Sequence, residues 1–403
     1  MLYRKLGKSG LDVSNLGFGC MRLPIQGGSQ SHLDGFDPNK IIDEEKATQM
    51  VEYAIEKGVN YFDTAYIYHA GQSETFLGKA LKKYRSQITL VTKLPVMLLK
   101  KREDSGRFLE KQLKRLDTDH LDVYLLHGLG RRSWGMVKEL GVLEFLDRIQ
   151  KDGRTRYVGF SFHDDVKIFK EIVDGYDWMM CQIQYNYFDE NRQAGKEGLT
   201  YAASKGLGIA IMEPIRGGKL ADPVPAEVQA LWNSAKKKRT PAGWALRWVW
   251  NHPEVSTVLS GMSEMSQVEE NIRIANEGKP HSLTKKDLST IDQVKKTYEK
   301  MLKIDCTGCA YCMPCESGVN IPTNLSLYND MFMFKDPELN VMLYNMMLSP
   351  EARASNCAEC GNCEERCPQR IQIMDTLKMV HETLFRPQPT AKPVHPPADR
   401  PPL

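Results

Sequence analysis

Two short stretches, Ile88-Thr-Leu-Val-Thr-Lys-Leu94 and Leu121-Asp-Val-Tyr-Leu-Leu-His127, decide the fold class of this sequence. Both are nearly continuous apolar runs, as expected of strands that are covered on both faces of a parallel sheet. Between them, Arg107–Leu116 carries apolar residues at helical spacing. A strand, a crossover helix and a second strand in this order form the βαβ unit of a parallel sheet.

The same alternation continues on both sides of these runs. Further strands are expected at Asn15–Leu23, Asn60–Ala65, Tyr157–Phe162, Met179–Tyr185, Leu207–Met212 and Val255–Ser260. Helices are expected, among other places, at Glu45–Lys57, Glu74–Tyr84, Val142–Lys151, Lys196–Lys205 and Pro241–Asn251. Eight strands within about 280 residues favour an α/β fold of the (β/α)8 TIM-barrel type over an open doubly wound sheet.

Four polar residues end or follow consecutive strands of the expected barrel: Asp63, Tyr68, Lys93 and His127. Barrel enzymes carry their chemistry at the carboxyl ends of the strands, so we expect these side chains at one face. An ammonium lowers the pKa of a neighbouring phenol, a carboxylate holds the ammonium in place, and an imidazole orients a carbonyl oxygen. Singly, each residue is often a helix cap, a solvated charge or a core histidine. Together they predict a site that protonates and polarises a C=O group.

Such a site lacks a hydride source, which a cofactor must supply. Four stretches resemble the signature of the aldo-keto reductase superfamily: Phe62-Asp-Thr-Ala-Tyr-Ile-Tyr-His-Ala-Gly-Gln-Ser-Glu74, Val91-Thr-Lys-Leu94, His120-Leu-Asp-Val-Tyr-Leu-Leu-His127 and Arg156-Tyr-Val-Gly-Phe-Ser161. The resemblance implies an NAD(P)H-dependent enzyme that reduces an aldehyde or ketone to an alcohol. It also implies that Tyr68 is the general acid, that Lys93 and Asp63 tune it, and that His127 orients the substrate carbonyl.

The resemblance also marks residues for the cofactor. The nicotinamide end is expected against Ser161, Gln182 and Met212, and the adenosine end against Gly261, Ser263, Gln267, Glu270 and Asn271. Gly19, Cys20 and Met21 match the first-strand contact of the family with the cofactor. Met212 replaces an aromatic residue of many relatives, and His163 stands close to a common Asn. Residues 261–267 contain no Lys or Arg to grip a 2′-phosphate, and Arg273 is the nearest candidate. Both NADP(H) and NAD(H) therefore stay open. FMN also stays open, because barrels can bind it without a short motif, but no motif here indicates it.

Eight of the ten cysteines lie in two runs, Cys306-x2-Cys309-x2-Cys312-x2-Cys315 and Cys357-x2-Cys360-x2-Cys363-x3-Cys367-Pro368. The second run has the spacing of a bacterial ferredoxin motif, and eight cysteines suffice for two [4Fe-4S] clusters. In two-cluster ferredoxins the fourth cysteine of each run ligates the other cluster. We therefore expect Cys367 to join Cys306, Cys309 and Cys312, and Cys315 to join Cys357, Cys360 and Cys363. Paired Cys-x2-Cys units also build zinc sites, but the repeated x2 spacing and the closing Cys-Pro favour clusters.

The cysteine runs also define the expected domains. Asn324–Leu348, between the runs, is rich in Leu, Met and Tyr at helical spacing, and one or two helices are expected there. We expect an aldo-keto reductase barrel at 1–282, a connecting helix at 283–303, a small helical ferredoxin-type [4Fe-4S] domain at 304–385 and a Pro-rich disordered tail at 386–403.

Composition limits the classes of partner that we expect for this protein. A net charge of +3 is too mild to argue for nucleic acid, and without an apolar run near 18 residues we expect no membrane span. The N-terminus has no apolar segment behind its charges, so we expect a cytoplasmic protein. A small-molecule carbonyl or alcohol is the expected substrate, and the ferredoxin-type domain leaves room for a redox protein partner.

The sequence leaves two other functions open. A nicotinamide delivers two electrons as hydride whereas a cluster passes one at a time, so one alternative is a ferredoxin-coupled oxidoreductase with flavin-mediated or one-electron chemistry. The other is a redox-responsive docking protein without activity. The complete set of four polar residues at the strand ends favours an enzyme.

Overall fold

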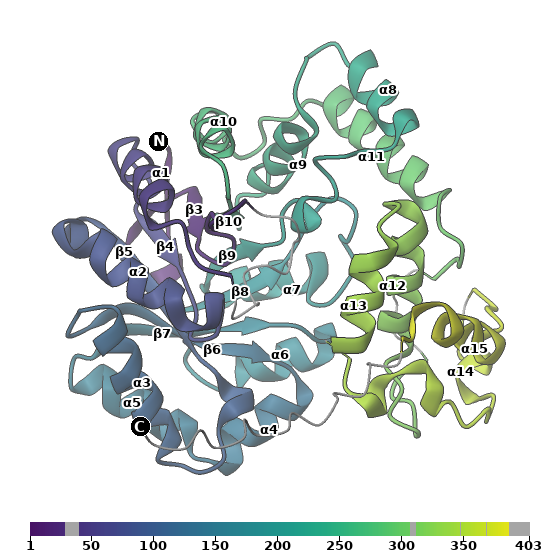
Figure 1. Cartoon of the computed structure of the whole chain (residues 1–403), viewed down its shortest axis with the longest axis horizontal. Helices are drawn as coiled ribbons and strands as arrows, with labels where there is room; N and C mark the ends of the chain where they lie inside the picture. Colours follow the sequence, from purple (N-terminus) through teal and green to yellow (C-terminus); the bar gives the residue numbers. More distant parts are fainter. Residues whose placement is uncertain (29–39, 307–311, 347, 368, 387–403) are drawn as a thin grey trace, which may run out of the picture. The chain divides into compact units, whose positions relative to one another are not determined.

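The chain divides into two compact units, Met1–Lys300 and Met301–Leu403, in the computed structural model (Figure 1). The structure describes residues 1–28, 40–306, 312–346, 348–367 and 369–386. The expected limits of the barrel at residue 282 and of the connecting helix at 283–303 stay predictions. Of the tail expected at 386–403, only Arg386 lies within the described residues.

Eight parallel strands close the first unit into a barrel. They are β3 (Leu16–Gly19), β4 (Tyr61–Asp63), β5 (Thr89–Leu94), β6 (Leu121–Leu129), β7 (Thr155–Phe162), β8 (Met180–Gln184), β9 (Gly208–Met212) and β10 (Thr257–Gly261). The last strand closes the barrel by pairing with the first, with Gly261 opposite Gly19. Each strand overlaps one of the eight predicted strands, so the predicted (β/α)8 barrel is confirmed.

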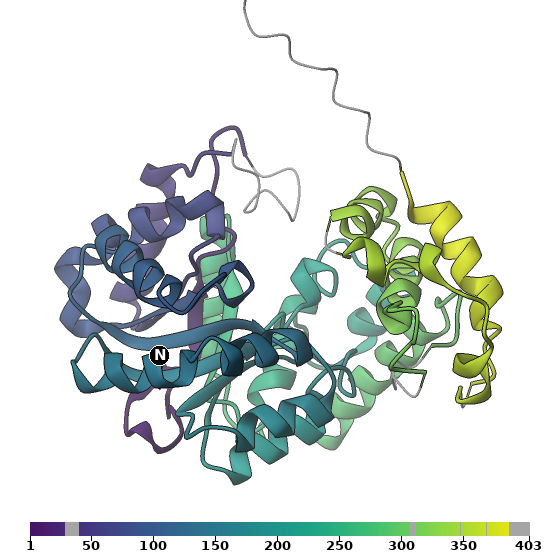
Figure 2. The same cartoon turned by 90° about the horizontal axis from the view of Figure 1, so that it is seen from below.

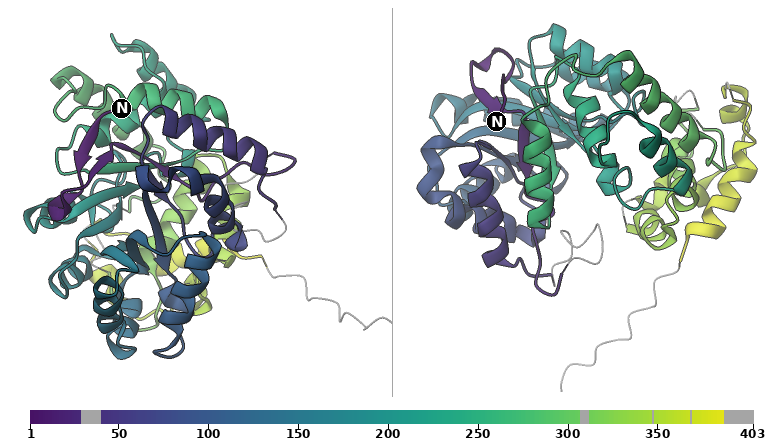
Figure 3. Two further views of the ribbon diagram at one scale, coloured as in Figure 1. Left: turned by 90° about the vertical axis from the view of Figure 1, so that its left-hand side faces the viewer. Right: turned by 90° about the horizontal axis from the view of Figure 1, so that it is seen from above.

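Helices surround the strands of the barrel (Figure 3). They are α1 (Glu44–Glu56), α2 (Gln72–Leu81), α3 (Asp104–Arg115), α4 (Arg131–Glu139), α5 (Val142–Lys151), α6 (Val166–Asp174), α7 (Gly195–Ser204), α8 (Ala226–Ser234), α9 (Pro241–Trp250), α10 (Met265–Ala275) and α11 (Lys285–Glu299). Several begin at a polar cap, such as Thr240, whose hydroxyl accepts the backbone N–H of Gly243 at the start of α9. Their buried faces pack on the outside of the barrel and fix where each strand ends.

A short hairpin precedes the barrel, formed by β1 (Tyr3–Lys5) and β2 (Asp12–Ser14), and Figure 2 shows it in purple. Leu6 and Val13 belong to an apolar cluster with inward residues of the strands, and Lys8 donates its backbone N–H to Gly206 just before β9. The hairpin therefore lies at the amino ends of the strands. The opposite, carboxyl end is left for chemistry.

One side chain of this hairpin bonds segments that are distant in sequence. The guanidinium of Arg4 donates to four backbone carbonyls, those of Trp250, His252, Val255 and Gly278, at 2.7–3.0 Å. Burial lowers the pKa of Arg4 to about 10, so it stays charged at neutral pH. Arg4 thus fastens the start of the chain to the last strand–helix segment of the barrel.

The second unit is helical, as predicted. Its helices are α12 (Ile321–Met333), α13 (Pro337–Met346), α14 (Asn362–Glu365) and α15 (Ile373–Leu384). They share an apolar core against which six of the cysteines pack: Cys306, Cys312, Cys315, Cys357, Cys363 and Cys367. Buried Asn324 ties the start of α12 to the second cysteine run, because its amide bonds Ala352 and Ala354 at 2.9–3.0 Å.

None of the described helices has the length and apolar character needed to cross a bilayer.

Candidate active site

The four predicted catalytic residues meet at the carboxyl end of the barrel. Asp63 ends β4, Lys93 lies near the end of β5, and His127 lies in β6, while Tyr68 begins a short 3-10 turn after β4. Lys93 Nζ lies 2.7 Å from Asp63 Oδ1 and 2.7 Å from the carbonyl oxygen of Thr64. The structure therefore brings these side chains together.

Tyr68 faces both Lys93 and His127. Lys93 Nζ lies 4.9 Å from the centre of the Tyr68 ring and is hydrogen-bonded to the Tyr68 side chain. The rings of Tyr68 and His127 meet edge to face, with their centres 5.9 Å apart. Lys93 is fully buried and Tyr68 nearly so, which excludes most water from this contact.

Burial and neighbouring charges set the pKa values of the site. Burial lowers the pKa of Lys93, but Asp63 and Tyr68 raise it by more, so the ammonium stays charged. Burial lowers the pKa of His127 to about 3, with Lys93 adding to the effect, so this imidazole is neutral at physiological pH. The expectation that Lys93 makes the phenol acidic needs correction: Lys93 does lower the pKa of Tyr68, but burial raises it by more.

A strained loop places Tyr68. His69, Ala70 and Gly71 follow it with positive φ angles of 49°, 53° and 90°. The φ of Gly71 is one that other residues rarely adopt, and a Cβ there would also meet the guanidinium of Arg115 at 2.5–2.8 Å, so this position favours glycine. Side chains other than glycine rarely adopt such φ values, so surrounding contacts must hold the loop in place.

One such contact is Arg115, which lies against Gly71 and donates to the backbone carbonyl of Tyr66. Arg115 is held in turn by buried Glu74, which the sequence reasoning did not single out. Its carboxylate accepts hydrogen bonds from Arg115 at 3.0 Å, Thr92 at 2.7 Å and Gln112 at 2.6 Å. Gln112 also donates to the backbone carbonyl of Lys93 at 3.1 Å. The network joins the Tyr68 loop to the strand that carries Lys93. In the sequence, Glu74 is marked only by its position as the last residue of the stretch Phe62–Glu74.

The residues expected at the nicotinamide lie on adjacent strands of the same barrel end. Ser161 on β7 pairs with Gln182 on β8, and Met212 ends β9 opposite Gln184. Ser161 Oγ accepts the backbone N–H of Gly128 at 2.8 Å. Gln182 is buried, and its Oε1 finds no hydrogen-bond partner among the residues that the structure describes. A buried acceptor without a partner is suited to a ligand amide such as the carboxamide of nicotinamide.

The first-strand residues lie beside this position. Gly19 ends β3, and the backbone N–H of Cys20 donates to the carbonyl of Asp63 at 2.8 Å. Cys20 is buried, burial raises its pKa, and Met21 is half-buried. These residues therefore lie next to Asp63.

The residues expected at the adenosine lie at the end of β10 and on α10. Gly261 and Gln267 are exposed, and Ser263 is half-buried. Asn271 is buried and donates to Ser260 Oγ at 3.0 Å, while Glu270 accepts from the hydroxyl of Thr240 at 2.6 Å. The set therefore lies at the end of β10 and along α10 and includes exposed, half-buried and buried residues.

Sequence reasoning also missed Arg22. Its side chain passes over Gly261, where a Cβ would come within 3.0 Å of it, and its Nη1 donates to the carbonyl of Gly217 at 2.7 Å. Burial lowers its pKa, and the carboxylate of Glu213 opposes that shift. Arg22 thus places a cation where the ends of β3, β9 and β10 meet. A single arginine after a strand carries no signal in sequence.

In the second unit, Cys312, Cys315, Cys357, Cys360 and Cys363 line one cavity. Cys315 lies here with the first three cysteines of the second run, but Cys312, which the crossed ligation assigns to the other cluster, lines the same cavity. The crossed ligation therefore stays a prediction. Among the described residues, no three His, Cys, Asp or Glu side chains close on a single point as the ligands of one metal ion would. A [4Fe-4S] cubane takes one thiolate at each of its four irons, so the cysteines around this cavity supply enough sulfur donors for one cluster.

The other expected cluster is described only in part. Cys306 and Cys367 pack against the same apolar core as Cys312. Cys309 lies outside the described residues. The assignment of Cys306, Cys309, Cys312 and Cys367 to one cluster stays a prediction.

Comparison with known proteins gives the class of this chain. Residues 15–296 match the model of the aldo/keto reductase family, and residues 305–372 match that of a 4Fe-4S dicluster domain. The chain therefore belongs to the aldo/keto reductase family. It is an oxidoreductase whose barrel is followed by a 4Fe-4S dicluster domain.

Three individual relatives each cover about seven tenths of this chain. The uncharacterized oxidoreductase YqkF of Bacillus subtilis is 27% identical over 312 residues, which cover 68% of this chain and 92% of that protein. L-galactose dehydrogenase of Arabidopsis thaliana is 28% identical and covers 72% of this chain and 93% of its own length. The aldo-keto reductase AKR11C1 of Bacillus halodurans, solved in its holo form, superposes with a TM-score of 0.60 at 29% identity, covering 73% of this chain and 96% of its own.

Proposed function

We propose that this chain reduces the carbonyl group of a small aldehyde or ketone to an alcohol, with NADP(H) or NAD(H) as hydride source and Tyr68 as general acid. The observation that carries the proposal is the fully buried ammonium of Lys93, held 2.7 Å from Asp63 and hydrogen-bonded to Tyr68. A buried charge is costly unless it is paired, and it is useful where negative charge develops during a reaction.

Each of the four residues has a task in this reaction. Tyr68 gives its hydroxyl proton to the carbonyl oxygen as that oxygen gains negative charge. The ammonium of Lys93, oriented by Asp63, stabilises the phenolate that remains. Neutral His127 donates a hydrogen bond to the same substrate oxygen, which positions the carbonyl and spreads its charge.

The cofactor positions fit this reaction. Ser161 and the unpartnered amide oxygen of Gln182 would hold the carboxamide of the nicotinamide. Arg22 adds a cation at the barrel mouth that suits the diphosphate of a dinucleotide. When bound, the dinucleotide supplies the hydride.

Replacement of the phenol tests the proposal. In Tyr68→Phe, reduction of a panel of aldehydes and ketones by NADPH or NADH should fall at least about 100-fold, because the proton donor is lost. Tyr66→Phe is a matched control. Tyr66 lies in the same loop, but its hydroxyl accepts a hydrogen bond from Lys111 of α3 at the exposed surface. Turnover that survives in Tyr68→Phe, or falls equally in both variants, would contradict the assignment.

A second role is supported by the exposure of Cys360, one of the five cysteines around the sulfur-lined cavity. A cluster held there would lie near the surface, where a redox protein exchanges electrons most readily. We propose that the dicluster domain passes electrons to or from such a partner. Anaerobic EPR spectra tell whether the barrel joins in: cluster reduction on addition of NADPH supports coupling within the chain, and oxidised clusters after NADPH addition exclude it.

A further inference from the structure

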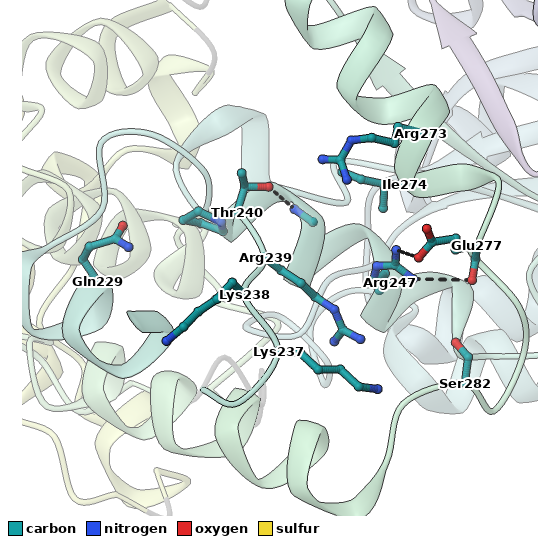
Figure 4. Close-up of a pocket in the computed structure, with 12 residues that line it drawn as sticks. Gln229, Lys237, Lys238, Arg239, Thr240, Arg247, Arg273, Ile274, Glu277 and Ser282 are labelled. Atoms are coloured by element: carbon teal, nitrogen blue, oxygen red, sulfur yellow. Dashed lines mark hydrogen bonds and ion pairs between the residues drawn. The ribbon is translucent and has the colours of Figure 1, made fainter. Parts of the chain in front are cut away.

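Four consecutive cations, Lys236-Lys237-Lys238-Arg239, precede helix α9 and have no task in the proposed reaction. Such a run is usually a solvated surface. Here Lys237, Lys238 and Arg239 line a cavity of about 770 Å³ between α8, α9 and α10 (Figure 4). This volume lies within the range of small-molecule sites, about 300–1,000 Å³.

Two more arginines from neighbouring helices complete the walls. Arg247 comes from α9 and Arg273 from α10, and Glu277 is the one acidic residue among those that line the cavity. Figure 4 shows the ends of Lys237, Arg239 and Arg247 on one side of the space and Arg273 above them. Lys238 turns away from this group and donates to the carbonyl of Asn233.

The acidic residues beside the cavity pair with only part of this positive charge. Glu277 pairs closely with Arg247, at 2.5 Å. The other ion pairs are longer, at 3.4 Å from Lys237 to Asp287, 3.7 Å from Arg239 to Asp287 and 3.8 Å from Arg273 to Glu270. Strong charge-assisted hydrogen bonds span about 2.7–2.9 Å. Asp287 also accepts the backbone N–H of Thr284 at 3.0 Å, so it is shared among several donors.

Arg239 is the best-fixed cation of the group. Its guanidinium lies 4.4 Å from the centre of the Trp244 ring, and its side chain is 13% exposed. Nη1 of this guanidinium is buried and has no hydrogen-bond partner in the described part of the chain. Stacking on an aromatic ring holds a planar donor group ready for an oxyanion.

We propose that this cavity binds a small molecule that carries a phosphate or diphosphate group, at a site separate from the mouth of the barrel. Several cations require a ligand with at least two negative charges, and guanidinium donors match phosphate oxygens in geometry. The space is larger than a bare phosphate, and Thr240, Ser282 and Gln229 offer hydroxyl and amide groups for the remainder of the ligand. The cavity adjoins Glu270 through Thr240, so the 2′-phosphate of the dinucleotide is the other source of the same group.

Calorimetric titration of the full-length protein with inorganic pyrophosphate, in phosphate-free buffer at low salt, tests the site. We expect binding both without and with saturating NADPH. Arg239→Gln and Arg273→Gln should each weaken it about tenfold, the effect of removing one charged hydrogen-bond donor. Lys236→Gln makes the same change of charge on an exposed residue that does not line the cavity, and it should leave the affinity within about twofold.

Three results would overturn the proposal. Absence of pyrophosphate binding would show that the cavity is not a phosphate site. If Lys236→Gln weakens binding as much as the two arginine variants do, the attraction is a general effect of positive surface charge. Loss of pyrophosphate binding when NADPH is saturating assigns the cations to the 2′-phosphate of the cofactor instead. Arg273 is 67% exposed, so Arg273→Gln decides the question even where Arg239→Gln disturbs the packing on Trp244. Thermal melting of each variant shows that it is folded.

Discussion

At the scale of single residues, the general acid that we propose, Tyr68, depends on keeping its proton until the reaction begins. Burial keeps the pKa of Tyr68 above its ordinary value although an ammonium lies beside it. A general acid must be protonated before the reaction begins, so a raised pKa keeps the donor loaded at neutral pH. Lys93 then matters most when the proton leaves, because it stabilises the phenolate in a site with little water.

This balance predicts a pH profile for carbonyl reduction. Tyr68 must be protonated to donate, so activity is present below its folded pKa and is lost as the pH rises through it. With that pKa raised above about 10, kcat/KM should stay flat from about pH 6 to about pH 9 and fall only beyond. Steady-state rates of carbonyl reduction, measured across this pH range at constant ionic strength, test the predicted profile. A decline centred near neutral pH would show that another group is the acid, and it would not be His127, whose pKa is about 3.

The buried ion pair of Lys93 and Asp63 predicts variants in which stability and activity change differently. Lys93→Met leaves the carboxylate of Asp63 buried and unpaired, which should cost about 3–5 kcal/mol of unfolding free energy in urea. Adding Asp63→Asn removes the stranded charge and should restore part of that loss. The double variant should remain inactive, because the cation is still missing. A double variant no more stable than Lys93→Met would contradict this account of the pair.

At the scale of elements, the loop after β4 depends on Glu74. Glu74→Gln keeps the shape of the side chain but removes the charge that Arg115 faces, and Arg115 is itself mostly buried. We expect a loss of about 1–3 kcal/mol in stability and a fall in kcat larger than the change in KM, since Tyr68 and Lys93 lose their relative position. Glu110→Gln, on the exposed face of α3, is the matched control and should change neither quantity. Equal effects of the two variants would refute the network.

A comparison of the elements shows which parts of the fold and of the site the sequence predicts and which it does not. The eight barrel strands were predictable because each is a short apolar run bounded by helices. The meeting of Asp63, Tyr68, Lys93 and His127 was predictable because these residues end or follow such runs. The hairpin of β1 and β2 was not predictable, since its strands have three residues each and β1 is half-exposed. Glu74, Arg22 and the cavity around Arg239 depend on contacts between distant segments, which no local pattern reveals.

At the scale of the whole molecule, two units with separate cores share one chain. The sulfur-lined cavity groups Cys315 with the second cysteine run, so loss of Cys315 should affect one cluster. We predict that Cys315→Ser, purified without oxygen, holds about four irons per chain where the native protein holds about eight. Cys181→Ala, in a barrel strand, should keep the full iron content. Iron analysis and EPR give the answer, and a Cys315→Ser protein that retains all its iron would contradict the crossed ligation.

The bonds of Arg4 carry a consequence for how the protein is made. Arg4 precedes its last acceptor, the carbonyl of Gly278, by most of the barrel, so a ribosome must synthesise nearly all of this unit before that bond can form. The segment that carries Arg4 therefore lacks these partners while most of the barrel is being synthesised. Replacement of Arg4 would then lower the yield of folded protein more than the turnover rate of the folded enzyme.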